Sequence, residues 1–311
     1  MSPVAMSTSN TLSNWWNGFS RDRDDERLIA WLFVAPAIVL LAMVAIYPFA
    51  QMIYDSLFGF TQAGERAAFV GIANYGTVLS DPRFLNATGF TVIFVVVSVT
   101  IEFLLGLGVS LLLYSAYIER RQLLVTLSIP PMIMSPIITG LTWRMLFSPS
   151  YGMVNHLLGL NIDWIASRPW SRVALIVADV WMWTPLFVLV FTAALQSIPD
   201  VYYEAAEVDG MSKWQQFKWI TLPQMRTAIV VVMLLRIVRA FKVFPKVQVL
   251  TQGGPGAYTE TIAMMTYNYG FRFFQLGVAS ASGVLYWLLM FLTAFVLFKS
   301  VAEGLISPEE D

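Results

Sequence analysis

The sequence has no cysteine and only one histidine, His156. Disulfides, iron–sulfur clusters and thiol nucleophiles are therefore excluded, and a zinc site would lack its usual ligands. Charge is also scarce, because Asp, Glu, Lys and Arg make up 13% of the chain, about half of the ~25% that a soluble domain carries. The net charge of -1 provides no basic field, so we expect no nucleic-acid partner.

Hydrophobic residues take the place of the missing charge, at 57% of the chain with a mean hydropathy of +0.65. An apolar stretch of ~20 residues can cross the ~30 Å hydrocarbon core of a bilayer as a helix. Stretches of this length predict an all-α membrane protein with about six transmembrane helices and the lipid bilayer as its surroundings. The predicted spans cover residues 28–50, 87–116, 122–147, 173–195, 228–250 and 277–298.

These spans predict three parts. Residues 28–299 form the transmembrane domain, residues 1–27 an N-terminal segment with an interfacial anchor, and residues 300–311 a tail. The N-terminus lacks the short apolar stretch and small-residue cleavage site of a signal peptide, so we expect the first span to be retained.

Lysine and arginine predict the orientation, because cytoplasmic loops carry an excess of both. Both termini are predicted to be cytoplasmic, since their side holds nine basic residues near the span ends and the other side holds five. The nine are Arg21, Arg23, Arg27, Arg120, Arg121, Lys213, Lys218, Arg226 and Lys299, and the five are Arg66, Arg83, Arg168, Arg172 and Arg272.

Prolines interrupt most of the predicted spans. Each proline removes a backbone donor and kinks its helix. In lipid this is tolerated only where protein or water donates a hydrogen bond to the carbonyl that has lost its amide donor. Kinked helices around a shared cavity are typical of a transporter, although transmembrane helices in general are also richer in proline. The prolines are Pro36, Pro48, Pro130, Pro131, Pro136, Pro185 and Pro245.

The longest polar interruption on the predicted cytoplasmic side, residues 196–226, has a helical pattern. Pro199 and Asp200 favour the start of a short helix, and Gly210 favours its end in a left-handed turn. A second short helix is expected over Ser212–Ile220, with one apolar face. We therefore expect a compact helical knob between the fourth and fifth spans.

The knob contains three short motifs in order: Glu204-Ala205-Ala206, Asp209-Gly210 and Ile220-Thr221-Leu222-Pro223. They lie between the fourth and fifth of the six predicted spans. In this order and place they resemble the Glu-Ala-Ala loop of binding-protein-dependent ABC importer permeases.

A second segment comprises Leu250-Thr251-Gln252-Gly253-Gly254-Pro255-Gly256, Thr259, Thr261, Gly270-Phe271, Leu276-Gly277 and Ala279-Ser280-Ala281. It resembles the carbohydrate branch of the same family, the permeases of the maltose and glycerol-phosphate types. With the knob it covers most of the chain from Ile198 to Ser282. Met211 stands where the family usually has alanine, and Pro245 stands where an acidic residue is common, so the sequence departs from the family at the outer end of the fifth span.

The resemblance implies a type I ABC importer permease fold in a bacterial inner membrane, with a cytoplasmic coupling helix in residues 196–226. It implies four partners: a second permease, usually a different homologue, two ATPase subunits and an external solute-binding protein. The chain has no Gly-x-x-x-x-Gly-Lys-Ser/Thr phosphate cradle. ATP and Mg would therefore be bound by the ATPase subunits, and this chain would carry no cofactor and would not itself be an enzyme.

The coupling residues implied by the resemblance centre on Glu204. Its carboxylate would make a charge-assisted contact with an arginine of the ATPase, which would transmit closure of the ATPase dimer to the spans. The alternative is an exposed helical glutamate that contributes little. The coupling set is Glu204, Ala205, Ala206, Asp209, Gly210, Leu222 and Pro223.

Charged residues inside the predicted spans point to a polar pathway, because a charge at the centre of a span costs roughly 2.5–3.5 kcal/mol unless it faces protein or water. They are Glu102, Arg144, Asp179, Arg236 and Arg239. Trp181 and Trp183 suit the apolar face of a sugar, and the arginines could donate to its hydroxyls. Alternatively, Arg236 and Arg239 pair with Asp179 or Glu102 as structural ion pairs. The resemblance places the substrate pathway at Met182, Trp183, Leu186, Arg236, Arg239, Ala240 and Val243.

Two other functions compete with a sugar importer. An ion-coupled secondary transporter also uses broken helices and buried charges, but the sequence shows no convincing repeat between its halves. An intramembrane serine protease could use Ser110, but His156 lies in a predicted external loop. The identity of the solute and the pairing of this permease with a copy of itself or with a different homologue stay open.

Overall fold

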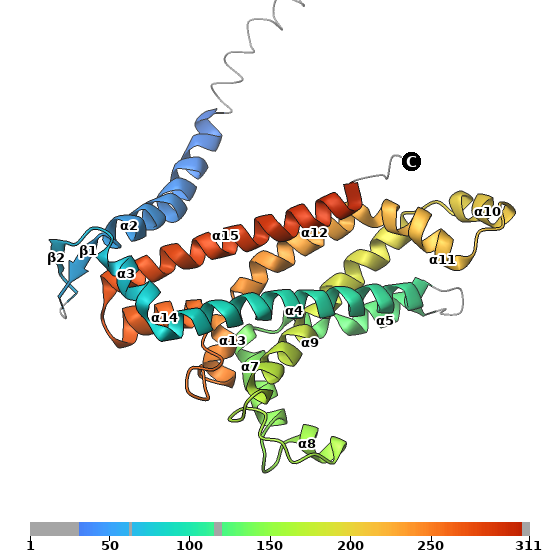
Figure 1. The fold of residues 1–311 in the computed structure, drawn as a ribbon. Coiled ribbons are helices and arrows are strands. Elements are labelled where there is room, and N and C mark those ends of the chain that lie inside the picture. The colour runs from blue at the N-terminus through green and yellow to red at the C-terminus, as the bar shows by residue number, and fades with distance from the viewer. Residues whose placement is uncertain (1–30, 62–63, 115–119, 307–311) are drawn as a thin grey trace, which may run out of the picture. The chain divides into compact units, whose positions relative to one another are not determined.

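The computed structural model describes residues 31–61, 64–114 and 120–306 (Figure 1), which fall into two units that divide between Tyr54 and Asp55. The predicted segment 1–27 and residues 307–311 of the predicted tail lie outside the described residues. Within the described part, five helices are long and apolar enough to cross a membrane, or six if one bent pair counts as a span. The prediction of an all-α membrane protein with about six transmembrane helices is confirmed.

The first unit is described from Trp31 onward as a single helix, whose last residue, Asp55, already belongs to the second unit. It contains the π-helical turn η1 (Ala42–Ile46) and the helix α2 (Tyr47–Asp55). The Tyr47 amide donates to the carbonyl of Ala42, five residues earlier, which widens the helix just before Pro48. A wide turn suits this position because proline has no amide hydrogen to donate.

Four long helices form the core of the second unit. They are α4 (Pro82–Tyr114), α9 (Trp170–Gln196), α12 (Leu222–Phe241) and α15 (Leu276–Ile306). α4 packs along α9, and α12 contacts α4, α9 and α15. The α4–α9 contact is close enough to require Gly106, because a Cβ atom there would lie 2.2 Å from the Cβ of Phe187. α4 begins ahead of the predicted start at residue 87, and α15 continues past the predicted end at 298.

The third predicted span, residues 122–147, is sharply broken in the structure. It comprises α5 (Arg121–Ser128), α6 (Pro130–Ile133) and α7 (Pro136–Leu146), and the chain bends by 96° between Ile133 and Pro136. Met134 and Ser135 are extended, with ψ of 144° and 142°. Pro136 explains the extended Ser135, because the ring of a proline disfavours the helical conformation of the residue before it.

The fifth predicted span, residues 228–250, also differs from the structure. One continuous helix over Lys213–Phe241 comprises α11 (Lys213–Gln216), the π-helical turn η2 (Phe217–Thr221) and α12. The expected second short helix of the knob is therefore the beginning of this long helix. The chain then starts a new helix, α13 (Phe244–Leu250), with Pro245 in its first turn, where its missing donor costs nothing.

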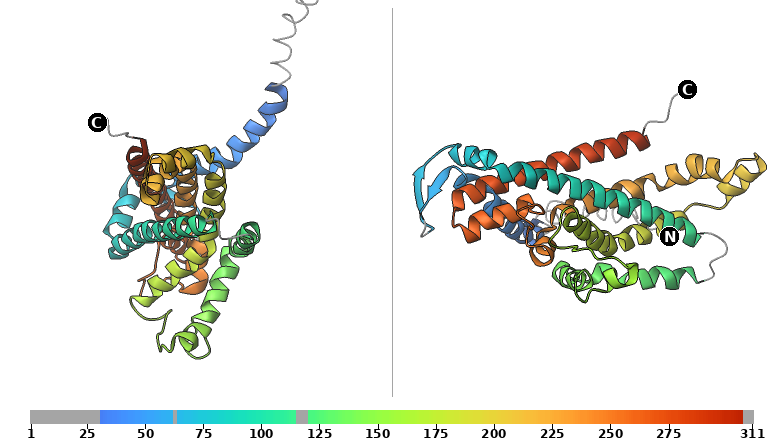
Figure 2. Two further views of the ribbon diagram at one scale, coloured as in Figure 1. Left: turned by 90° about the vertical axis from the view of Figure 1, so that its right-hand side faces the viewer. Right: turned by 60° about the horizontal axis from the view of Figure 1, so that its bottom comes forward.

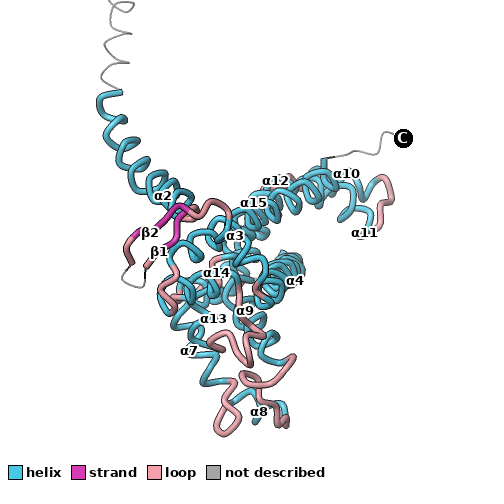
Figure 3. The backbone as a smooth tube through the Cα atoms, turned by 60° about the vertical axis from the view of Figure 1, so that its left-hand side comes forward, coloured by secondary structure: helices cyan, strands magenta, loops and turns pink. Residues whose placement is uncertain are grey.

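The remaining elements lie at the ends of the bundle. Figure 1 shows α10 and α11 at the end of α4 and α9 that is opposite the β-hairpin and α3, and Figure 2 shows the same separation from another side. Figure 3 shows the hairpin as the only strands of the described residues. These elements are β1 (Phe58–Phe60), β2 (Arg66–Phe69), α3 (Ala73–Ser80), α8 (Met153–Leu158), α10 (Val201–Val208), α14 (Ile262–Tyr267) and η3 (Asn268–Arg272).

Candidate functional site

The knob is built from α10, a turn at Gly210 and α11. Gly210 has a φ of +72°, the left-handed conformation that its type favours. The Met211 amide donates to the carbonyl of Ala206 over 2.9 Å, which closes the turn behind the helix. Ser212 and Gln215 then form a reciprocal capping box that starts α11. The two helices are therefore held in a fixed bend by local interactions.

The predicted coupling residues occupy both faces of this bend. Ala206 is buried, whereas Glu204, Ala205 and Asp209 are exposed. Pro223 lies in the first turn of α12 and is exposed, and Leu222 is half-buried. The hydroxyl groups of Tyr203 and Thr221 lie 2.9 Å apart, and Thr221 directly precedes α12. This contact therefore joins α10 to the start of α12.

The acidic residues of α10 differ in their partners. Glu207 accepts a 2.7 Å hydrogen bond from Lys213, and this contact holds the pKa of Glu207 below its ordinary value. No ion pair of Glu204 is found among the described residues. Of these two glutamates, Glu204 is thus the one whose carboxylate is available to another protein.

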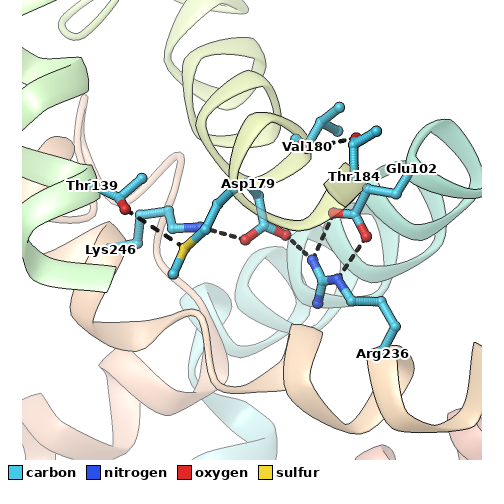
Figure 4. A network of polar contacts seen from close by, with 8 residues as sticks. Glu102, Thr139, Asp179, Val180, Thr184, Arg236 and Lys246 are labelled. Atoms are coloured by element: carbon cyan, nitrogen blue, oxygen red, sulfur yellow. Dashed lines mark hydrogen bonds and ion pairs between the residues drawn. The ribbon is translucent and has the colours of Figure 1, made fainter. Parts of the chain in front are cut away.

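A network of four buried charges crosses the bundle (Figure 4). Arg236 of α12 donates from Nε and Nη2 to the two carboxylate oxygens of Glu102 on α4, over 2.6 and 2.8 Å. Its Nη2 also donates to Asp179 on α9. Lys246 of α13 donates to the other oxygen of Asp179 over 2.5 Å. The network joins four helices inside the membrane-spanning part of the chain.

The network is electrically balanced, with two carboxylates and two cations. All four side chains are at most 4% exposed. Removing one partner from such a group leaves an uncompensated buried charge, which is far more costly than the intact network. The sequence predicted two alternative roles for Arg236, binding of the solute or a structural ion pair with Asp179 or Glu102. In the structure, Arg236 forms ion pairs with both of these carboxylates.

Lys246 is the member of the network that the sequence analysis missed. It lies inside the predicted span 228–250, so the rule that selected the other charges applies to it as well. Two of the five charges selected by that rule are exposed in this chain, Arg144 and Arg239. Arg144 donates to the carbonyl of Val249 over 2.9 Å, which joins α7 to α13.

Trp183 brings together two of the predicted pathway arginines. Its ring centroid lies 5.3 Å from the guanidinium carbon of Arg236 and 5.1 Å from that of Arg239. Arg236 is buried in the network, and Arg239 is exposed beside it. The indole ring therefore contacts both a neutralised cation and a cation that forms no ion pair among the described residues.

The other predicted pathway residues lie deeper in the chain. Met182, Ala240 and Val243 are buried in the apolar core, and Leu186 is half-buried against it. The Thr139 hydroxyl, which Figure 4 shows beside Lys246, donates to the sulfur of Met182 over 3.6 Å. These residues are thus less accessible than Arg239, which is exposed, whereas Trp183 is half-buried.

Trp181 lies elsewhere. It lines an apolar groove of about 490 Å³ together with residues of α4, the broken third span and α9. Its ring packs edge-on against Trp143 at 5.9 Å. The two tryptophans that the sequence suggested for one sugar site therefore serve different surfaces.

The end of the bundle with the hairpin carries its own polar cluster. Asp81 accepts hydrogen bonds from Arg83 and from the Tyr269 hydroxyl, at 3.1 and 2.6 Å. Although burial acts to raise the pKa of Asp81, these hydrogen bonds hold it at about 2. Arg172 of α9 stacks on Tyr258 and donates to Asn86 of α4, which fastens the loop 251–261 between α13 and α14 to these two helices. Across the part of the chain described here, no group of three or more His, Asp or Glu side chains could hold a metal.

Comparison with known proteins gives one family match and many relatives. The family described as binding-protein-dependent transport system inner membrane component matches residues 116–302. The trehalose/maltose transport system permease protein MalF of Thermococcus litoralis is 33% identical over 278 residues, which cover 88% of this chain and 94% of that protein. The trehalose transport system permease protein SugA of Mycobacterium tuberculosis is 32% identical, with 92% and 94% covered.

Solved structures give the same fold. A chain of a bacterial ABC transporter involved in the import of the acidic polysaccharide alginate superposes with a TM-score of 0.76. The alignment covers 93% of this chain and 99% of that chain at 21% identity. The predicted resemblance to ABC importer permeases and their type I fold is confirmed by these matches.

Proposed function

This chain belongs to the family of binding-protein-dependent transport system inner membrane components, and from this premise we propose that it is the permease subunit of an ATP-driven importer. A multi-pass permease needs a motor that it does not contain. The absence of a phosphate-cradle motif in its sequence is in keeping with ATP and Mg bound by two separate ATPase subunits. A second permease and an external binding protein complete the proposed complex, with both termini of this chain in the cytoplasm.

The observation that carries the proposal is the geometry of α10. Glu204 is exposed at one end of the bundle on a helix whose exit is fixed by the left-handed Gly210. Behind this surface, the contact between Tyr203 and Thr221 leads into the membrane-spanning α12. A contact between an ATPase arginine and Glu204 would thus act on a rigid bend joined to a span. Ala205, Ala206, Asp209, Leu222 and Pro223 would shape the same contact.

We propose a sugar or sugar derivative as the solute. The two relatives named above support this class, since they are permeases of trehalose/maltose and trehalose transport systems. In this chain the face of Trp183, flanked by Arg239, offers an aromatic surface with a hydrogen-bond donor beside it. Such a pair suits the apolar face and the hydroxyl groups of a sugar ring.

The test uses the complete transporter in proteoliposomes, with its ATPase and binding protein. Glu204→Ala and Gly210→Asp are expected to abolish the stimulation of ATP hydrolysis by the loaded binding protein. Glu207→Gln is the matched control, because Glu207 lies one turn further along α10 and is already paired with Lys213. It should retain stimulation, and normal stimulation in the first two variants would refute the coupling role.

The alternative function, an ion-coupled secondary transporter, is distinguished from an ATP-driven importer by its energy source. Uptake of radiolabelled trehalose, maltose and glucuronic acid is measured with and without ATP and with and without the ATPase subunits, at a fixed ion gradient. An importer of the proposed kind accumulates sugar only when both are present. Accumulation driven by the gradient alone would favour the alternative.

A further inference from the structure

The charges in the membrane-spanning part of the chain do not all cancel. Glu102 and Asp179 are matched by Arg236 and Lys246 in the buried network. Arg239 lies one turn beyond Arg236 on α12 and forms no ion pair with a carboxylate of the described residues. Its described partner is the ring of Trp183. One positive charge is therefore left over at this point of the bundle.

This charge lies at mid-span level. Trp183 is the central residue of α9, a helix of 27 residues between Trp170 and Gln196, and so lies about 20 Å from either end at ~1.5 Å per residue. The guanidinium carbon of Arg239 is 5.1 Å from its ring. A side chain at this depth cannot reach the surface layer of the bilayer as terminal arginines do.

An arginine at this depth needs a counter-charge or water. Arg239 lies in the last turn of α12, where the helix dipole favours a cation, but this effect is weaker than the cost of placing the charge in lipid. Arg239 is also exposed in the isolated chain, so its surface is covered in the membrane by a water-filled path or by another subunit. Lys242, exposed at the end of the same helix, adds a second positive charge to this side.

We propose that Arg239, held against the face of Trp183, binds the negatively charged group of the transported solute. The substrate class is then an acidic sugar, such as one that carries a carboxylate, and the aromatic ring receives the apolar face of the same sugar. The planar guanidinium suits a carboxylate because it can donate two parallel hydrogen bonds. This inference rests on the proposed function and names the substrate class of that site.

The experiment compares two sugars that differ by one charged group. Equilibrium binding of radiolabelled glucuronic acid and glucose is measured on the assembled transporter without its binding protein. The wild-type complex is expected to bind glucuronic acid about tenfold to hundredfold more tightly, the range that a hydrogen bond between charged groups provides. Arg239→Gln should bring the two affinities together, and Arg239→Lys should keep part of the preference.

Arg120→Gln is the matched control, since it removes an exposed arginine at the start of α5, and it should keep the full preference. Equal affinities in the wild type, no binding of glucuronic acid, or a preference that survives in Arg239→Gln would each overturn the inference. So would loss of the second permease from purified Arg239→Gln complexes, because Arg239 would then pair with a carboxylate of that subunit.

The two levels of the proposal fail separately. Sugar uptake that depends on ATP but shows no preference for acidic sugars would refute the substrate class and leave the importer standing. Binding of glucuronic acid that depends on Arg239, in a complex whose transport ignores ATP, would refute the importer and leave the substrate class standing.

Discussion

The knob around α10 and the network around Arg236 use the same kinds of side chain in opposite surroundings. In the knob, Glu204 and Glu207 are exposed on a short helix. In the network, Glu102 and Asp179 are enclosed and share two cations. Water solvates a carboxylate in the knob, whereas in the network only the protein can do so.

This contrast separates two uses of charge. A solvated glutamate contributes little to the stability of its own chain and is therefore suited to a contact with a partner. A buried, fully paired carboxylate fixes the relative positions of the helices that pair with it. Substitutions of the charged side chains should consequently change stability in the network and coupling in the knob.

The largest effect is expected from Arg236→Met, because this variant removes the guanidinium group that pairs with both carboxylates of the network. The free energy of unfolding should fall by about 3–5 kcal/mol, the range observed when one partner of a buried ion pair is removed. The measurement is reversible unfolding of the purified subunit in mixed detergent micelles.

Lys246→Met provides the graded control for this prediction. It leaves Asp179 paired with Arg236, so its destabilisation should be clearly smaller than that of Arg236→Met. If the Arg236→Met protein cannot be purified in folded form, a normal yield of folded Lys246→Met protein would still show which substitution destabilises the fold more. Equal losses in both variants would contradict the network as drawn in Figure 4.

An intermediate effect is expected from Gly210→Ala in the knob. A Cβ atom at Gly210 would meet no neighbour within 4 Å, so the cost is limited to the left-handed backbone at φ +72°, about 1–2 kcal/mol for an L-residue. The same unfolding assay measures it. Gly210→Asn should cost less, because asparagine tolerates this conformation, and no difference between the variants would argue against a strained turn.

The smallest effect is expected from Glu207→Gln. Its hydrogen bond with Lys213 lowers the pKa of Glu207, so the pair is intact above the ordinary pKa of a glutamate and weakens as the pH falls below it. Both side chains are exposed, and the melting temperature should not shift measurably at neutral pH. A clear drop would mean that the knob holds the fold as the network does.

The sequence predicted the membrane helices well because their length and apolarity are local properties. The left-handed turn at Gly210 was also predictable from local sequence, because a glycine directly after a short helical pattern favours this conformation. The breaks at Met134 and after Phe241 depended on how the prolines act in the packed bundle. A proline can bend a helix, end it or start the next one, and the packed neighbours decide which.

The polar site was less predictable because pairing is a tertiary property. Glu102 and Arg236 are 134 residues apart in sequence, and nothing local distinguishes Arg236, which is enclosed, from Arg239, which is exposed. Lys246 could have been found by applying the rule for charges within spans without exception. The separation of Trp181 from Trp183 follows from helical geometry, because two residues that are two positions apart in sequence lie on nearly opposite faces of a helix.

The contact at Gly106 constrains how this protein can move. The Cβ atom of Phe187 occupies the space that a larger side chain at residue 106 would need, so sliding α4 along α9 by one turn would bring Phe187 against a residue that is not glycine. We therefore expect α4 and α9 to move together as one body in any conformational change of the protein.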